Sequence, residues 1–292
     1  MAGSASKGGL SKACWRIGRR LALRAASHRL DLVAAGVAYY ALLALFPGLA
    51  ALVAGFALLG DPGEVGRHLA AAQVVAPASV VSLARAQLSR LADAPSGALA
   101  ISGVLSFSLA VWGLNRGVAG FRLALISVDP RAGRSRLVPQ TVRSLVLTAS
   151  GLLVAMAALA LLAVAPALAA LVPGQFWLQM LGSALRWPVL LAASAVYAAM
   201  LYRWGVNRRR RSWRFVLWPA FGAAVVWLLA SAALGAYVEG FAAINQTYGS
   251  LAGVVVLLLW LFVTAYVFLL GAELSFVLEE AARADDAEAA AD

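Results

Sequence analysis

Charged residues are scarce in this chain, and acidic residues are the scarcer kind. Aspartate and glutamate together number 13 among 292 residues, lysine and arginine number 24, and charged residues make up only 13% of the total. A soluble domain typically carries about 25% charged residues. Hydrophobic residues account for 63% of this chain, and a soluble protein built from it would expose large apolar patches. We therefore expect much of the surface to face lipid.

Cysteine and histidine are also rare, which argues against several kinds of site. Cys14 is the single cysteine, so it cannot form an internal disulfide, and the chain has no cysteine spacing typical of a metal site. The two histidines are His28 and His68, and no group of histidine and carboxylate residues has metal-ligand spacing. We expect no metal, no cofactor and no catalytic residues.

Six apolar runs are long enough to cross a bilayer, which takes about 20 residues for about 30 Å of hydrocarbon. They are residues 33–59, 98–115, 144–166, 183–203, 215–238 and 251–277. The first run is too long for the apolar core of a signal peptide. We predict an all-α polytopic membrane protein. Its parts would be a basic N-terminal segment, a six-helix domain and an acidic, flexible tail, residues 1–32, 33–278 and 279–292.

The distribution of basic residues predicts the orientation. With the N-terminus in the cytoplasm, 20 of the 24 lysines and arginines fall in cytoplasmic segments and only Arg67, Arg85, Arg90 and Arg186 fall outside. Cytoplasmic loops normally carry such an excess. Both ends are therefore predicted to be cytoplasmic, and the net charge of +11 is explained by topology rather than by nucleic-acid binding. His28 and His68 would lie on opposite sides of the membrane, which argues against a nuclease.

Two further stretches have an amphipathic pattern typical of helices that lie in the membrane interface. In residues 80–91, Val80, Ala84, Leu88 and Leu91 share one helical face. In residues 116–127, an apolar face opposes two arginines; the apolar residues are Val118, Phe121 and Leu125, and the arginines are Arg116 and Arg122.

Three stretches resemble one known family. They are LVAAGVAYYALLALFPGLAAL at residues 32–52, SLAVWGLNRG at residues 108–117, and WPAFGAAVVWLLAS followed by NQTYGSLAGVVVLLLWLFVTAYVFLLGAEL between residues 218 and 274. Together they are similar to the YihY/BrkB family, which was once catalogued as ribonuclease BN. The resemblance covers nearly the whole chain. It implies an integral protein of the bacterial cytoplasmic membrane with six helices, and it assigns no activity.

Glu273 is the ionisable residue of greatest interest, because a charge within a span is costly and often functional. It lies 22 residues after Leu251, which is about 33 Å along a helix and therefore near the inner interface. Two interpretations stay open. Glu273 belongs either to a structural ion pair with a basic residue or to a transport site.

Other polar or helix-bending residues mark a candidate cavity or gate. Pro47 removes a helix hydrogen bond, so the first span is expected to kink or break between Ala44 and Pro47. Tyr39 and Tyr40 precede it and either line a cavity or anchor the helix at the interface. Asn115 ends the second run. Asn245 and Tyr248 lie in a polar turn that either connects two helices or covers a cavity.

Two groups of arginines are candidate contacts for lipid headgroups. The run Arg208, Arg209, Arg210 and Arg211 follows the fourth span, and topology with anionic headgroup contact explains it better than nucleic acid does. Arg186 is expected at or just inside the outer interface, within reach of a phosphate.

These observations favour a transporter or permease for a small or amphiphilic, lipid-like substrate. The alternative is a non-catalytic scaffold for envelope assembly. A transporter predicts a polar-lined cavity that includes some of the candidate residues, whereas a scaffold predicts an apolar groove or face that lipid does not explain. The sequence predicts neither a substrate nor an oligomeric state.

Overall fold

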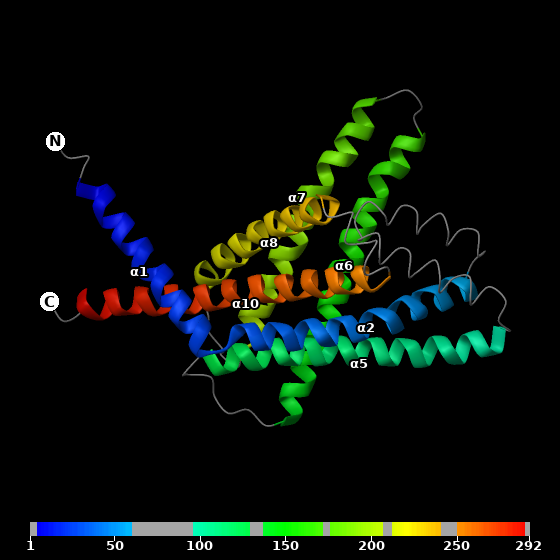
Figure 1. Cartoon of the computed structure of the whole chain (residues 1–292), viewed down its shortest axis with the longest axis horizontal. Helices are drawn as coiled ribbons and strands as arrows, with labels where there is room; N and C mark the ends of the chain where they lie inside the picture. The colour runs from blue at the N-terminus through cyan, green and yellow to red at the C-terminus, as the bar shows by residue number, and fades with distance from the viewer. Residues whose placement is uncertain are drawn as a thin grey trace. The chain divides into compact units, whose positions relative to one another are not determined.

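Helices account for nearly all of the described chain. The computed structural model describes residues 5–59, 96–128, 137–171, 176–206, 212–240 and 250–289. Within these residues there are seven helices and no strand (Figure 1). They are α1 (Ala5–Ser27), α2 (Leu30–Leu59), α5 (Ser96–Val128), α6 (Leu137–Leu171), α7 (Phe176–Trp204), α8 (Arg214–Gly240) and α10 (Ser250–Ala289). The all-α prediction is confirmed.

Six of these helices are long and apolar enough to cross a membrane. The candidate spans are Leu30–Ala51, Ile101–Val128, Gln140–Leu161, Ala184–Trp204, Arg214–Tyr237 and Gly253–Ala284. They coincide with the six runs read from the sequence, apart from shifts at the ends. The prediction of six spans is therefore confirmed for the described residues.

The basic helix α1 is separated from the first span by a tight corner. Ser27 ends α1, and Arg29 adopts a φ of 48°, in the left-handed region that non-glycine residues rarely enter. The backbone N–H of Arg29 donates to Ala26 O at 3.2 Å, and Val33 N–H donates to Arg29 O at 3.2 Å. Asp31 lies in the first turn of α2, where a carboxylate favours the positive end of the helix dipole.

Two expectations about individual helices differ from the structure, one wholly and one in part. Residues 116–127 do not form a separate interfacial helix, because α5 continues without interruption to Val128. Its Arg122 is also not on a solvated face: the residue is only 4% exposed. The first span was expected to kink or break between Ala44 and Pro47; it does not break, since α2 runs as one helix from Leu30 to Leu59, and a kink stays a prediction. Neighbouring side chains and local adjustment commonly let membrane helices accommodate proline in this way.

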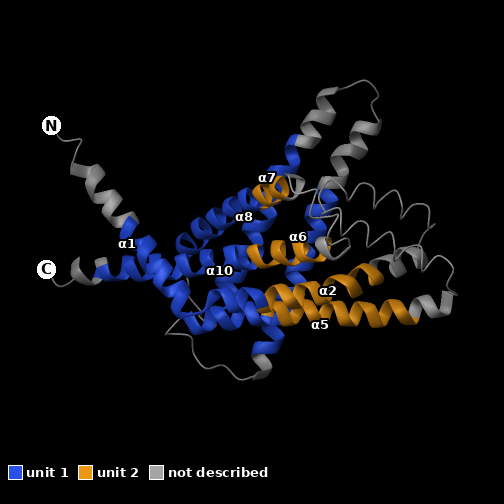
Figure 2. Ribbon diagram, in the orientation of Figure 1, with its two compact units in different colours: residues 1–35, 119–230, 264–292 blue, residues 36–118, 231–263 orange. Residues whose placement is uncertain are grey.

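The described chain divides into two compact units, coloured separately in Figure 2. Unit 1 contains residues 1–35, 119–230 and 264–292, and unit 2 contains residues 36–118 and 231–263. All of α6 and α7 belong to unit 1, whereas α2, α5, α8 and α10 each contribute residues to both units.

Small residues bring helices close together within unit 2. A Cβ added to Gly113 would lie 2.9 Å from the Cβ of Ala44, and one added to Gly48 would lie 3.7 Å from the Cβ of Ala110. Small residues allow the close approach that stabilises helix pairs in lipid, where the hydrophobic effect between helices is absent. The α2–α5 contact therefore depends on Gly113.

Unit 1 is held by side chains that bond to backbone carbonyls of neighbouring helices. The hydroxyl of Tyr202 on α7, which is fully buried, donates to Phe268 O on α10 at 2.6 Å. Ser275 on α10 donates to Phe215 O on α8. Gly271 makes room for this packing, because a Cβ there would lie 2.5 Å from the Tyr202 hydroxyl oxygen.

The amphipathic stretch 80–91 lies outside the described residues. The C-terminal segment is helical as far as Ala289, as part of α10. The flexibility expected for residues 279–292 stays a prediction.

Candidate functional site

Arg24 connects three helices of unit 1. Its Nε lies 2.5 Å from Glu273 Oε1, and its Nη1 lies 2.6 Å from Glu280 Oε2, so one guanidinium on α1 binds two carboxylates of α10. Its Nη2 also donates to Val128 O, at the end of α5, at 3.2 Å. A planar guanidinium with five N–H donors is suited to such a junction.

Glu273 is the most deeply buried carboxylate of this contact, with its side chain only 1% exposed. Its Oε1 faces both Arg24 Nε and, at 3.4 Å, Nδ1 of His28. Its Oε2 and the His28 Nδ1 are buried and have no hydrogen-bond partner among the described residues. An unpaired buried acceptor costs about 1–3 kcal/mol, so the ion pair leaves part of the site unsatisfied.

Electrostatics around Arg24 favour its charged form. Burial by itself lowers the pKa of the Arg24 guanidinium, but the hydrogen bond and negative charge of Glu273, together with Glu280, outweigh burial and raise the pKa above its ordinary value. Arg24 therefore stays protonated throughout the physiological range. It supplies a fixed positive charge beside Glu273.

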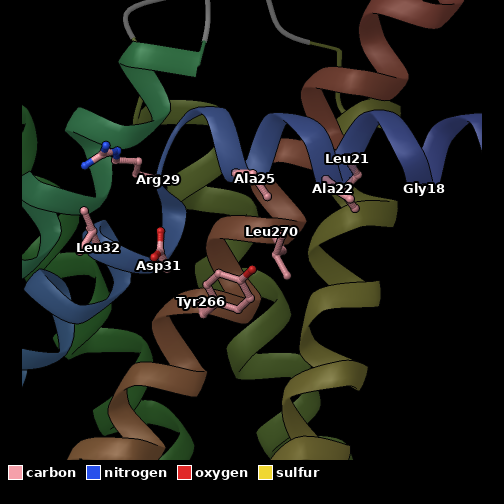
Figure 3. Close-up of a pocket in the computed structure, with 10 residues that line it drawn as sticks. Gly18, Leu21, Ala22, Ala25, Arg29, Asp31, Leu32, Tyr266 and Leu270 are labelled. Carbon is pink, nitrogen blue, oxygen red and sulfur yellow. The ribbon is translucent and has the colours of Figure 1, made fainter.

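A pocket lies beside this ion pair, also within unit 1, with a volume of about 790 Å³. We call it the α1–α10 pocket. It is lined by Gly18, Leu21, Ala22, Ala25, Ala26, Arg29, Asp31, Leu32, Tyr266 and Leu270. Figure 3 shows Leu21, Ala22 and Ala25 on α1 with Tyr266 and Leu270 on α10, and the Arg29 side chain points away from Tyr266. The lining is therefore mostly apolar, with charged groups at the α1–α2 corner.

Arg122 and Arg143 bind the end of α7. Arg122 donates from Nε to Gly205 O at 3.1 Å and from Nη1 to Gln140 O at 2.6 Å. Arg143 donates to Val206 O at 3.3 Å. Cations that bond the last carbonyls of a helix also favour the negative end of its dipole. The structure thus gives both arginines a role in holding α7 against α5 and α6.

Several predicted cavity residues lie in unit 2. Tyr39 is 55% exposed. The Tyr40 ring packs edge-to-face on Trp112, with ring centroids 6.2 Å apart. Pro47 is half-buried in α2. Asn115 lies within α5 and has an interaction partner. Tyr40 and Asn115 thus belong to the α2–α5 part of unit 2, whereas Glu273 belongs to unit 1. Their shared role as a cavity stays a prediction.

The remaining predicted residues divide into two sets. Arg186 is half-buried, stacks on Trp187 with its Cζ 5.4 Å from the ring centroid, and has a buried Nε without a hydrogen-bond partner in the described part of the chain. Its contact with lipid stays a prediction. Asn245 and Tyr248, and the run Arg208, Arg209, Arg210 and Arg211, lie outside the described residues.

Sequence reasoning missed the partners of Glu273. It anticipated a basic partner as one alternative, but it did not identify Arg24, which is 249 residues away in the chain, or His28. It also missed the pocket. The available signal was weak, because Arg24 is one of seven basic residues in the N-terminal segment. Among the described residues, no group of three or more histidine, cysteine or carboxylate residues is arranged to hold a metal ion.

Comparison with known proteins places the chain in a family. It is 27% identical over 262 residues to a Bacillus subtilis (strain 168) protein with the provisional name ribonuclease-like protein YfkH. The match covers 86% of this chain and 91% of that relative. No solved structure matches. The family model described as Virulence factor BrkB matches residues 21–292. That match spans all six candidate spans, and the chain therefore belongs to the BrkB virulence factor family.

Proposed function

We propose that this protein transports a small amphiphilic, lipid-like substrate across the bacterial cytoplasmic membrane, with both termini in the cytoplasm. Its BrkB family membership and six apolar helices support a role in a membrane. The excess of basic residues in the segments expected to be cytoplasmic supports the orientation.

The α1–α10 pocket is the observation that carries the proposal. Its volume of about 790 Å³ lies within the range of about 300–1,000 Å³ that is typical of small-molecule sites. Leucine and alanine side chains offer contact to an acyl or other apolar chain, while Arg29 and Asp31 offer charges at one end. An amphiphile matches this division, since it has an apolar body and a polar head.

The position of the pocket suits a substrate that arrives from the membrane. One wall is α1, a basic helix outside the spans, and the other is α10, a span that carries Tyr266 and Leu270. A basic amphipathic helix beside a span is typical of the membrane interface. A molecule already partitioned into the bilayer could therefore reach the pocket sideways.

The word ribonuclease belongs to the name of the relative, and hydrolysis is not part of this proposal.

The test is lipid translocation in proteoliposomes. The full chain is reconstituted with a short-chain fluorescent phospholipid, and exchange between leaflets is followed by dithionite quenching. Ala22→Trp, which places a large ring in the pocket, should slow exchange several-fold. Leu23→Trp is the matched control: Leu23 is the next residue of α1, is 60% exposed and does not line the pocket.

The outcomes separate the two functions. Faster exchange than in empty vesicles, slowed by Ala22→Trp and not by Leu23→Trp, supports transport through the α1–α10 pocket. Exchange no faster than in empty vesicles would count against the transporter and favour the scaffold. Equal effects of both tryptophan variants would show that the pocket takes no part.

A further inference from the structure

The corner between α1 and α2 holds two opposite charges that do not bind each other. Arg29 and Asp31 are two positions apart, both are exposed, and both line the α1–α10 pocket. Neither side chain forms a hydrogen bond or an ion pair with another residue in the described part of the chain. In Figure 3 the Arg29 guanidinium points away from Asp31. The corner therefore offers a cation and an anion whose hydrogen-bonding capacity the described residues do not use.

The backbone holds this corner in an unusual conformation. Arg29 has a φ of 48°, in the left-handed region that is uncommon for residues other than glycine. Hydrogen bonds on both sides hold it there, because Arg29 N–H donates to Ala26 O and Arg29 O accepts from Val33 N–H. Sparsely populated backbone conformations cluster at active sites and ligand-binding sites. The fold thus fixes the points from which the two charged side chains extend.

The other charges beside the pocket are already paired within the protein. Arg24 binds both Glu273 and Glu280. Of the ten residues that line the pocket, Arg29 and Asp31 are the charged ones. A ligand that enters the pocket therefore meets one cation and one anion, close together and at the same end.

This charged end lies at the level where lipid headgroups lie. Asp31 is the second residue of the candidate span Leu30–Ala51, and the end of a span meets the headgroup region of the bilayer. The apolar part of the lining continues from there. Leu32 follows Asp31 and is 57% exposed, while Tyr266 and Leu270 are four positions apart and share a face of α10. A phospholipid fits with its head at the corner and its acyl chains along these apolar side chains.

We propose that the α1–α10 pocket selects phospholipids whose head carries both a phosphate and a primary ammonium, as phosphatidylethanolamine does. The proposal rests on the lipid transport proposed above and names its substrate class. The Arg29 guanidinium donates two parallel hydrogen bonds to the phosphate, a geometry for which arginine is suited. The Asp31 carboxylate accepts a hydrogen bond from the ammonium, which has three N–H donors.

The two charges together discriminate against other heads. Phosphatidylglycerol has a phosphate and no cation, so its head leaves Asp31 without a partner and brings a second negative charge close to that carboxylate. Phosphatidylcholine has a cation, but its quaternary nitrogen has no N–H to donate. The expected order of affinity is therefore phosphatidylethanolamine, then phosphatidylcholine, then phosphatidylglycerol.

The first test is binding, which does not depend on transport. The detergent-solubilised full chain is mixed with equal amounts of the three phospholipids, and the bound lipids are counted by native mass spectrometry. Asp31→Asn should lower the ratio of bound phosphatidylethanolamine to phosphatidylglycerol by up to about fivefold, since exposed ion pairs contribute modestly. Asparagine also suits the start of a helix, so the fold is kept. Asp286→Asn is the matched control, because Asp286 is an exposed carboxylate of α10 that does not line the pocket.

Arg29→Asn tests the phosphate contact in the same assay. Asparagine tolerates the left-handed backbone better than most residues, and the variant should weaken binding of all three phospholipids because all three carry a phosphate. Arg16→Asn is the matched control, since Arg16 is exposed on α1 and does not line the pocket. Equal binding of the three lipids to the wild type, or an unchanged ratio in Asp31→Asn, would overturn the proposal.

The second test is exchange in proteoliposomes with the same three lipids, each labelled on a short acyl chain so that the head is unchanged. The wild type should exchange phosphatidylethanolamine fastest, and Asp31→Asn should reduce that preference. Exchange at one rate for all three heads would overturn the selection and leave transport in place. Preferential binding without any exchange would instead refute the proposed function and leave the headgroup site.

Discussion

Arg24 Nε lies 2.5 Å from Glu273 Oε1, although 249 residues separate the two in the chain. The pair brings the basic N-terminal helix against the last span, and it lies next to both the α1–α10 pocket and the His28 contact. Its energetics can be tested apart from any function.

Removing Arg24 should destabilise the fold more than removing Glu273. Arg24→Gln leaves a carboxylate with 1% exposure without its cation, and breaking a buried pair in this way costs about 3–5 kcal/mol. Glu273→Gln leaves the half-buried guanidinium of Arg24, which still forms its ion pair with Glu280. Unfolding of the detergent-solubilised protein, followed by circular dichroism, measures both.

The double variant Arg24→Gln with Glu273→Gln supplies the control for that comparison. Removing both charges should recover part of the stability lost in Arg24→Gln, because no buried charge remains. Strictly additive losses would mean that the two charges do not interact in the folded protein.

Replacing Arg122 should loosen the end of α7. Arg122→Leu removes the donors to Gly205 O and Gln140 O, and hydrogen bonds from a charged group contribute about 1.5–3 kcal/mol. Arg116→Leu is the matched control, since Arg116 is exposed on the same helix and stacks on Trp112. The midpoint of thermal unfolding should fall for Arg122→Leu and change little for Arg116→Leu. Equal shifts would contradict the assigned role.

Gly113→Ala should destabilise the α2–α5 contact of unit 2. The new Cβ would lie 2.9 Å from Ala44 Cβ and 3.2 Å from its Cα, so the helices must move apart. Gly36→Ala, on α2 of the same unit, meets nothing within 4 Å, and it should stabilise its helix by about 0.5–1 kcal/mol. Opposite shifts in thermal midpoint are expected, and a higher midpoint for Gly113→Ala would refute the close contact.

The topology can be tested with the single cysteine of the chain. Cys14 should react with a membrane-impermeant maleimide only in inside-out vesicles or permeabilised cells, because the N-terminus is predicted to be cytoplasmic. Asn245→Cys in a Cys14→Ser background should react from the outside of intact cells. Labelling of both positions from one side would rule out an odd number of spans between them.

Much of the fold was predictable because membrane insertion depends on local properties. A run of about 20 apolar residues suffices to indicate a span, so the six spans could be recognised from the sequence. Proline indicates helix breaks less reliably than apolar length indicates spans. Pro47 predicts a local disturbance, but the surrounding helix tolerates it and α2 continues.

The candidate site was less predictable because its contacts join distant parts of the chain. Glu273 was recognisable as unusual from its position in an apolar run, and its depth predicted a place near the membrane interface. Its partner was not recognisable, since any of the basic residues on that side could reach it. Arg122 was misplaced for a related reason. Its spacing resembles a solvated helix face, yet the carbonyls at the end of α7 accept its N–H groups and let it be buried.

The sequence by itself determined that the chain enters a membrane and how many helices cross it, because apolar length and hydration cost act residue by residue. Only the tertiary structure decided which charges meet. Arg24, His28 and Glu273 come together because α1 and α10 pack side by side, and burial makes that choice of partners energetically decisive. The same packing forms the α1–α10 pocket, since a cavity exists only where side chains of different helices leave space between them.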